Sequence, residues 1–307
     1  MGAEKIAVIG NGIIGHGVAQ VFASVGHKVT MIGRSRASLD TAIGKIQESL
    51  AEFVRQDLLS ADDAKAVPGR INLSTDLKDA ANADLVIEAV TEDLPLKLQI
   101  FGELDAMCPP TTILASSSGQ PASALVANVK HRDRVIATHF WYPPQLIPLV
   151  EVCGGPFCSP AVLARTVAII RGTGKEPVVI EKEVKGFIGN RLQFALLREA
   201  WALWAEGIAS AEAIDAVVRA SFGRRIGITG PIESADIGGL ATMVNFGNSL
   251  IPDLSTAPQA PDKVAVLVTQ SGMPGIYDWR KRDAGALRAR RMDELFRWLK
   301  ADRDNKK

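Results

Sequence analysis

Residues 6–17 read IAVIGNGIIGHG, in which four apolar residues run directly into the glycine pattern G-x-G-x-x-G. The first glycine allows a tight turn, the second lets a pyrophosphate approach the backbone, and the third lets a helix pack closely on a strand. The N-terminus of that helix then faces the phosphate charge. This strand–turn–helix context predicts a dinucleotide site made by Gly10, Asn11, Gly12, Ile13, Ile14 and Gly15.

Outward from this stretch, short apolar runs rich in β-branched residues alternate with helical patterns. Several runs are apolar on both faces, as strands of a parallel sheet covered by helices should be. We therefore predict an α/β fold, with an N-terminal Rossmann-type doubly wound sheet in residues 1–183. Beyond that boundary the strand patterns stop, which predicts an all-helical domain in residues 184–307. The expected strands are 5–10, 28–33, 70–74, 84–90, 111–117, 134–140, 149–152 and 177–182.

The composition gives no case for a protein that binds nucleic acid or an anionic membrane surface. The chain has 307 residues, a net charge of +1 and 47% hydrophobic residues, so it can form a large core without a strong surface charge. Its three cysteines have no C-x-x-C spacing, and we expect neither disulfides nor a metal site. No leader pattern or membrane-spanning run is recognised, which predicts a cytoplasmic protein. The basic helical pattern near the C-terminus is typical of a solvated face.

The second expected strand ends unusually. A carboxylate commonly follows this strand and binds a ribose hydroxyl, but here the chain reads Gly33, Arg34, Ser35 and Arg36, with no acid before Asp40. An acid would repel a ribose 2′-phosphate, whereas arginine binds it with charge-assisted hydrogen bonds. This stretch therefore favours NADP over NAD. The alternative is that both arginines are solvated residues at the start of the next helix.

A histidine and a glutamate lie on two consecutive expected strands. His139 ends the first and Glu151 follows 12 residues later, across a proline-containing loop. Adjacent strands would bring the imidazole and carboxylate together, and the carboxylate would fix the ring tautomer and raise its basicity. The pair is thus either a general base for an alcohol proton or a buried structural pair.

With these segments in view, the chain resembles the 3-hydroxyacyl-CoA dehydrogenase superfamily over nearly its whole length. The resemblance rests on IAVIGNGIIGHGVAQ, DLVIEAVTEDLPLK, ILASSSG, THFWYPP, PLVEV, KGFIGNRL and GPIESADIGGL, in that order. It implies oxidation of a hydroxyl to a carbonyl, and it implies that the helical domain in residues 184–307 binds substrate and forms the homodimer. It also implies that His139 is the base and Glu151 its partner, that Ser118 and Asn190 hold the substrate oxygen, and that Glu92 and Lys97 contact the cofactor.

Several segments resemble most the short branch of this superfamily that includes L-gulonate 3-dehydrogenase. In that branch an arginine anchors a substrate carboxylate, and the resemblance places Arg225 there, unless this residue forms an interdomain salt bridge. Tyr142 stands where the family has asparagine, so it is a candidate lining residue of a changed substrate pocket. The lysines that meet CoA phosphates in CoA-dependent members are replaced by LAEFVRQDLLS, which argues against a CoA ester.

Three functions follow as hypotheses. The first is a dehydrogenase that acts on a small, carboxylate-bearing hydroxy acid or related alcohol with NADP, or alternatively NAD. The second keeps the chemistry but acts on a short-chain 3-hydroxyacyl-CoA. The third is a non-catalytic NADPH-binding or structural protein, which the complete set of Ser118, His139, Glu151 and Asn190 disfavours.

Overall fold

A computed structural model describes residues 3–269 and 275–305 of the chain. The chain forms two compact units, one made of residues 1–188 together with 290–307 and the other of residues 189–289. The first unit contains one eight-stranded sheet, whereas the described residues of the second form helices and loops. The predicted α/β class, with a Rossmann-type sheet followed by a helical C-terminal region, is confirmed.

The sheet has the strand order β3-β2-β1-β4-β5-β6-β7-β8. All neighbouring pairs are parallel except β6 and β7, which are antiparallel. The order reverses between β1 and β4, and ligands of doubly wound sheets bind outside the carboxyl ends of the strands at this point. The strands are β1 (Lys5–Ile9), β2 (Lys28–Ile32), β3 (Ile71–Ser74), β4 (Leu85–Glu88), β5 (Ile113–Ser116), β6 (Val135–Phe140), β7 (Leu149–Cys153) and β8 (Glu176–Val179).

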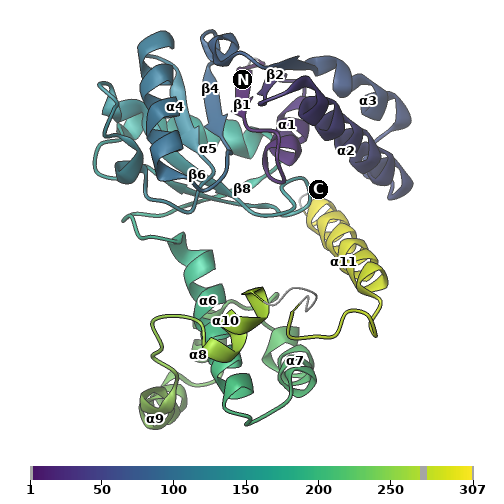
Figure 1. Ribbon diagram of the computed structural model, residues 1–307, viewed down its shortest axis with the longest axis vertical. Coiled ribbons are helices and arrows are strands. Elements are labelled where there is room, and N and C mark those ends of the chain that lie inside the picture. The colour runs from purple at the N-terminus through teal and green to yellow at the C-terminus, as the bar shows by residue number, and fades with distance from the viewer. Residues whose placement is uncertain (1–2, 270–274, 306–307) are drawn as a thin grey trace. The chain divides into compact units, whose positions relative to one another are not determined.

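Helices cover both faces of this sheet, because alternate strand residues form two apolar clusters. One cluster joins the strands to α1 (Gly15–Ser24), α2 (Arg36–Arg55) and α5 (Pro160–Gly172). The other joins them to α4 (Leu94–Met107). Figure 1 shows α1 and α2 on one side of the strands and α4 on the other. A short helix α3 (Ala61–Ala66) follows α2, and short 3-10 turns occur at Pro68–Arg70, Leu77–Ala80, Ala122–Leu125, Arg132–Arg134, Phe222–Arg224 and Ile251–Asp253.

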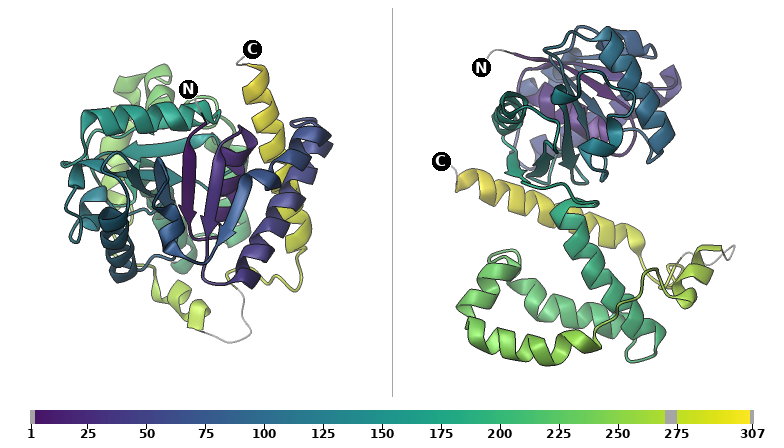
Figure 2. Two further views of the ribbon diagram at one scale, coloured as in Figure 1. Left: turned by 90° about the horizontal axis from the view of Figure 1, so that it is seen from above. Right: turned by 90° about the vertical axis from the view of Figure 1, so that its left-hand side faces the viewer.

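The last helix, α11 (Ala284–Asp304), returns to the first unit. Phe296 is 3% exposed, and its ring packs edge-on against Phe53 of α2 with 5.2 Å between centroids. Leu146, in the loop between β6 and β7, joins the same cluster. Figure 2 shows this helix, in yellow, beside α2. The compact units therefore differ from the predicted division at residues 183/184 chiefly at the C-terminus, because α11 has an apolar side that packs on α2.

The second unit contains most of α6 (Phe187–Ala205), followed by α7 (Ala211–Ala220), α8 (Pro231–Ile237), α9 (Leu240–Leu250) and α10 (Asp262–Thr269). Ser210 caps α7, because its hydroxyl accepts a hydrogen bond from the backbone N–H of Ala213. Such a side-chain acceptor satisfies one of the unpaired N–H groups at a helix start. Many large apolar side chains of this unit are exposed, including Ile228, Ile232 and Ile237, each more than 70% exposed.

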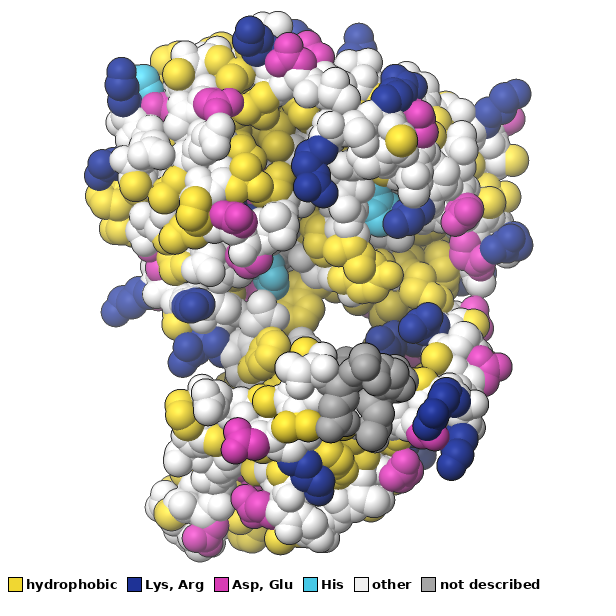
Figure 3. Space-filling view, in the orientation of Figure 1, with side chains coloured by type: hydrophobic (Ala, Val, Ile, Leu, Met, Phe, Trp, Pro, Cys, Tyr) yellow, Lys and Arg dark blue, Asp and Glu magenta, His cyan; other side chains and the backbone are white. Residues whose placement is uncertain are grey.

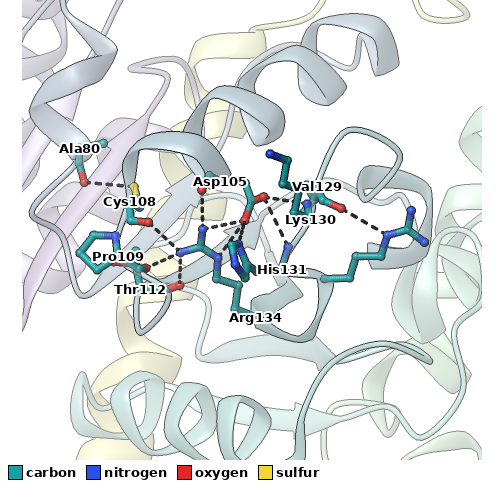
Figure 4. Close-up of polar contacts among 10 residues, drawn as sticks. Ala80, Asp105, Cys108, Pro109, Thr112, Val129, Lys130, His131 and Arg134 are labelled. Atoms are coloured by element: carbon teal, nitrogen blue, oxygen red, sulfur yellow. Dashed lines mark hydrogen bonds and ion pairs between the residues drawn. The ribbon is translucent and has the colours of Figure 1, made fainter.

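A buried ionic cluster stabilises the end of α4 (Figure 4). The guanidinium of Arg134, which is 1% exposed, donates to the Asp105 carboxylate at 2.7 Å and to the carbonyl oxygen of Asp105 at 2.9 Å. It also donates to the carbonyls of Cys108, Pro109 and Thr112 at the C-terminal end of the helix. Burial disfavours the charged form of Asp105, but hydrogen bonds from Arg134, the Lys130 N–H and His131 outweigh it and lower the pKa of this carboxyl.

The surface carries both charge signs in mixture. On the face shown in Figure 3, the Lys and Arg side chains are interspersed with Asp and Glu. Among the described residues, no helix has both the length and the apolar character needed to cross a membrane.

Candidate active site

The glycine turn after β1 has the geometry that a dinucleotide requires. Gly10 has φ +101°, and a Cβ there would lie 2.6 Å from the carbonyl oxygen of Ala89. A Cβ on Gly15, the first residue of α1, would lie 1.8 Å from the carbonyl oxygen of Gly10. A Cβ on Gly12 would meet nothing within 4 Å, so the backbone is open there. The turn therefore packs tightly at its first and third glycines and leaves space at the second, which fits a pyrophosphate at the start of α1.

The turn after β2 is basic and tightly packed. Arg34 and Arg36 are exposed, and the Arg36 Nε lies 2.9 Å from Asp40 Oδ1, one helical turn along α2. The Ser35 hydroxyl caps α2 by accepting from the Ser38 N–H at 3.3 Å. A Cβ on Gly33 would lie 2.6 Å from Oδ1 of Asn11 in the glycine turn. The Asn11 side chain thus fills the space that a longer residue at position 33 would need.

A buried polar network connects the carboxyl ends of β4 and β5 with α4. The Glu88 carboxylate, at the end of β4, is fully buried and accepts from the Lys97 ammonium at 2.8 Å and the Ser116 hydroxyl at 2.6 Å. Lys97 Nζ also lies 3.4 Å from Glu92 Oε2, and the Ser118 hydroxyl donates to the other oxygen of Glu92. The fold thus brings the predicted Glu92, Lys97 and Ser118 together beside the glycine turn, since all follow strands that end at one edge of the sheet.

The sheet register places His139 directly opposite Glu151. Residues paired across antiparallel strands present their side chains on the same face with Cβ atoms about 4.5–5.5 Å apart. The Nδ1 of His139 lies 2.8 Å from Oε2 of Glu151. An ionised carboxylate only accepts, so Nδ1 carries the proton, and the other ring nitrogen, Nε2, is the basic one.

Two further N–H groups hold the same carboxylate. The indole Nε1 of Trp141 donates to Oε2 of Glu151 at 3.1 Å, and the backbone N–H of Ile188, at the start of α6, donates to Oε1 at 2.9 Å. Glu151 is 2% exposed and His139 retains 12% of its side-chain surface. The carboxylate is therefore buried while the imidazole stays accessible, which suits a base that receives a proton from a bound molecule.

The remaining predicted substrate residues lie in exposed segments or in the second unit. Tyr142 follows the histidine strand, joins Pro143 through a cis peptide bond and is 57% exposed. Asn190 lies in the first turn of α6, and Arg225 follows a 3-10 turn; both belong to residues 189–289. The roles proposed for Ser118, Tyr142, Asn190 and Arg225 at the substrate stay predictions.

Sequence reasoning missed Glu88 and Ser116, and it did not connect Trp141 with Glu151. One signal for Glu88 was available, because a carboxylate that ends the otherwise apolar strand LVIE must be paired when that strand is buried. Trp141 lies two residues after His139, the spacing of residues that share one face of a strand, but β6 ends at Phe140. The sequence did not show that its indole would reach the carboxylate.

The cysteine thiols are held in their neutral form, since burial raises the pKa of all three. Burial raises the pKa of Cys158 to about 11, which disfavours the thiolate needed by a nucleophile. Across residues 3–269 and 275–305, no group of three or more His, Cys, Asp or Glu side chains is arranged to hold a metal ion.

Comparison with known families matches two family models to consecutive parts of the chain, up to residue 275. Residues 5–184 match the 3-hydroxyacyl-CoA dehydrogenase NAD-binding domain, and residues 186–275 match the 3-hydroxyacyl-CoA dehydrogenase C-terminal domain. These two matches confirm the resemblance seen in the sequence motifs.

Individual relatives act on different substrates. The chain is 33% identical to 5-formyl-3-hydroxy-2-methylpyridine 4-carboxylate 5-dehydrogenase of Mesorhizobium japonicum, over 95% of this chain and 96% of the relative. It is 32% identical to 3-hydroxyadipyl-CoA dehydrogenase of Escherichia coli, over 98% of this chain and 64% of the relative. It is 33% identical to the human lambda-crystallin homolog, over 76% of this chain and 74% of the relative. A solved structure of the pyridine carboxylate dehydrogenase, described as an NAD+-dependent dismutase, superposes with a TM-score of 0.87 and 29% identity over 98% of this chain and 99% of that one.

Proposed function

The chain belongs to the 3-hydroxyacyl-CoA dehydrogenase family and is a nicotinamide-dependent dehydrogenase of CH–OH groups, and on that premise we propose that it oxidises a small hydroxy acid with a His–Glu general base. The observation that carries this proposal is the 2.8 Å contact between His139 and Glu151, on neighbouring strands at the sheet edge that also carries the glycine turn. A carboxylate behind an accessible imidazole is the arrangement expected of a base that takes a hydroxyl proton.

In this proposal each residue has a defined task. Nε2 of His139 removes the hydroxyl proton, while Glu151 holds the ring through Nδ1 and stabilises the imidazolium that forms. Asn190 donates a hydrogen bond to the oxygen as it becomes a carbonyl. Ser118 does the same once its single O–H turns from Glu92 to the substrate. When bound, the nicotinamide accepts the hydride. Glu92 and Lys97 would contact the bound cofactor. Lys97 is held in place by its ion pair with Glu88.

For the cofactor we propose NADP in preference to NAD. The support is the turn after β2, where Gly33 offers no carboxylate, Arg34 and Arg36 are exposed, and Ser35 starts α2. A 2′-phosphate there would receive charge-assisted hydrogen bonds, each contributing about 1.5–3 kcal/mol. NAD is the alternative, because the family model is named for NAD binding and the pyridine carboxylate dehydrogenase is described as NAD+-dependent.

Fluorescence titration of the purified protein with NADPH and NADH tests the cofactor preference. We expect NADPH to bind at least about tenfold more tightly, and replacement of both Arg34 and Arg36 by Ala to remove that difference. Arg55→Ala, at the far end of α2, is the matched control and should leave both affinities unchanged. Tighter binding of NADH by the unmodified chain would contradict the proposal.

A gain-of-function variant sharpens the same test. Gly33→Asp alone should bind both cofactors poorly, because its Cβ would lie 2.6 Å from the Asn11 amide oxygen. Gly33→Asp combined with Asn11→Gly removes the overlap with Asn11 and leaves only the flexible end of Leu39, 2.9 Å from the new Cβ, to move aside. This double variant should favour NADH, since the new carboxylate can bind the ribose hydroxyls.

For the substrate we propose a small carboxylate-bearing hydroxy acid, with Tyr142 lining the pocket and Arg225 binding the carboxylate. The support is the geometric match of an arginine fork with a carboxylate, together with the relative that acts on a pyridine carboxylate. A short-chain 3-hydroxyacyl-CoA is the second candidate, supported by the relative named 3-hydroxyadipyl-CoA dehydrogenase. A panel of hydroxy acids and CoA esters with the preferred cofactor separates the two, and turnover of any member argues against a purely structural role.

We propose that the protein works as a homodimer formed through its helical unit. The support is the set of large apolar side chains exposed on this unit, because apolar patches of this kind mark protein interfaces. Size-exclusion chromatography with light scattering tests this proposal, and a monomer at micromolar concentration would contradict it. The side chains are Leu192, Phe194, Ile208, Ile228, Ile232, Ile237, Leu240, Phe246 and Ile251.

His139→Gln tests the catalytic proposal. We expect kcat to fall by about 10²- to 10⁴-fold, the usual contribution of a general base, while NADPH affinity changes less than about twofold. His131→Gln is the matched control, because His131 also contacts a buried carboxylate, Asp105, at 3.1 Å. Undiminished turnover of His139→Gln would remove this residue as the base while leaving the family assignment in place.

A further inference from the structure

Trp141 contacts the same carboxylate oxygen as the catalytic histidine. Its indole Nε1 lies 3.1 Å from Oε2 of Glu151, and the Nδ1 of His139 lies 2.8 Å from that oxygen. The indole and imidazole rings meet edge to face, with 5.4 Å between centroids and 68° between planes. Trp141 therefore interacts both with the ring of the proposed base and with its carboxylate.

The direction of the Trp141 hydrogen bond is unambiguous. An indole nitrogen is a donor only, so it always presents a proton to the carboxylate. Hydrogen bonds to the charged form of a carboxyl group stabilise that form. The Ile188 N–H acts on the other oxygen, Oε1, at 2.9 Å. Together these donors fix the carboxylate plane, which keeps Oε2 aimed at the histidine.

From this geometry we propose that Trp141 is a positioning residue that sets the proton affinity of the His139–Glu151 pair. The proposal rests on the proposed function, in which His139 is the base. The indole draws electron density from Oε2, so the carboxylate stabilises the imidazolium less than it would alone. Trp141 thus keeps the base neutral to lower pH while holding the carboxylate ionised.

The charged groups on the elements around His139 and Glu151 either have partners of their own or are exposed to solvent. Towards β4 and β5, Glu88 pairs with Lys97, and Glu92 accepts from the Ser118 hydroxyl. On the segment before α6, Glu183 accepts from the Ser123 N–H, and Lys185 is exposed. The ring of Phe187, which is fully buried, contacts the imidazole without a polar atom, 5.6 Å between centroids.

Trp141→Phe tests this proposal, because it removes the donor and keeps an aromatic ring. The full-length chain, ¹⁵N-labelled and saturated with NADPH, is titrated by NMR with the ring nitrogens of His139 as the probe. Without the indole, the carboxylate holds the imidazolium more strongly. The midpoint should therefore rise by about 0.3–1 pH unit, which is part of the strength of one hydrogen bond to a charged group. Trp298→Phe, on the terminal helix, is the matched control and should leave the midpoint unchanged. An unchanged midpoint in Trp141→Phe would overturn the proposal.

A measurement on the unmodified chain keeps the proposal testable even if Trp141→Phe folds poorly. The indole N–H signal of Trp141 should shift with pH at the same midpoint as the His139 ring, because both donors share Oε2. The proposal would be overturned if the chemical shift of the indole N–H did not change with pH at that midpoint.

Turnover provides the readout that separates positioning from a purely structural role. With the hydroxy acid that the panel identifies, the acid limb of kcat/KM in the oxidation direction should move to higher pH. At fixed pH on that limb kcat should fall about two- to tenfold with KM nearly unchanged. A large rise in KM without a shift of the limb would indicate a structural role and overturn the proposal. Retained turnover in His139→Gln would instead overturn the proposed function, so the two failures are distinguishable.

Discussion

The first unit contains two histidine–carboxylate contacts that differ in the other partners of the carboxylate. His131 Nδ1 lies 3.1 Å from Asp105 and His139 Nδ1 lies 2.8 Å from Glu151. Asp105 also binds Arg134, whose guanidinium is always charged, and the histidine beside it is half exposed. Glu151 instead receives N–H groups from Trp141 and Ile188.

The two carboxylates differ in how their buried charge is compensated. At Asp105 the permanent cation compensates the buried charge, so the histidine contributes little and the cluster stabilises the end of α4. At Glu151 a titratable imidazole faces the same edge of the sheet as the glycine turn, so the proton on that ring can exchange with a bound molecule. The first carboxylate thus has a permanent cation as its partner, whereas the second has only a histidine and neutral N–H donors.

The largest effect should come from Arg134→Met. Removing this guanidinium leaves Asp105 buried with weaker partners and leaves the carbonyls at the end of α4 without their donor. We expect the free energy of unfolding to fall by about 3–5 kcal/mol, measured by urea denaturation. Turnover at a temperature where the variant stays folded should be within about twofold of the unmodified chain. Arg132→Met, at the exposed neighbour, is the control, and an equal loss there would contradict the role given to Arg134.

A smaller effect concerns acid stability. The pKa of Asp105 is lowered in the folded state, so the stabilisation that it provides is present above the unfolded value of about 4 and is lost as the pH falls through the folded value. Between about pH 5 and pH 2 the unmodified chain should therefore lose stability more steeply than Asp105→Asn, which should be less stable at neutral pH. Urea midpoints across this range measure the difference. Parallel curves would show that Asp105 does not contribute to acid unfolding.

The smallest effect should come from His131→Gln, and it sharpens the contrast with His139→Gln. Because Arg134 already compensates Asp105 and His131 is half exposed, we expect a loss of less than about 1 kcal/mol and turnover within about twofold. Thermal unfolding and kcat are measured side by side for both variants. Loss of turnover in His131→Gln would mean that the two pairs are not functionally distinct.

Much of the site could be predicted because it is encoded locally. The glycine spacing after an apolar strand indicates the turn, and a 12-residue spacing across a proline-containing loop brings His139 opposite Glu151 on adjacent strands. The missing carboxylate at Gly33 is likewise visible in the chain, and so are the motifs that identify the family. Each of these signals depends on turn chemistry or on alternation along one strand, which neighbouring residues determine.

The sequence alone therefore determined the fold class, the glycine turn after the first strand and the position of His139 opposite Glu151, while the roles of these residues stay predictions. Only the tertiary structure decided which buried charges meet across long separations, as Asp105 meets Arg134 and Glu88 meets Lys97 and Ser116. It also decided that Phe296 packs on α2 and Leu146, and that the Trp141 indole reaches the carboxylate beside His139. The physical reason is that such contacts depend on sheet order, register and helix placement together, and no local pattern specifies these.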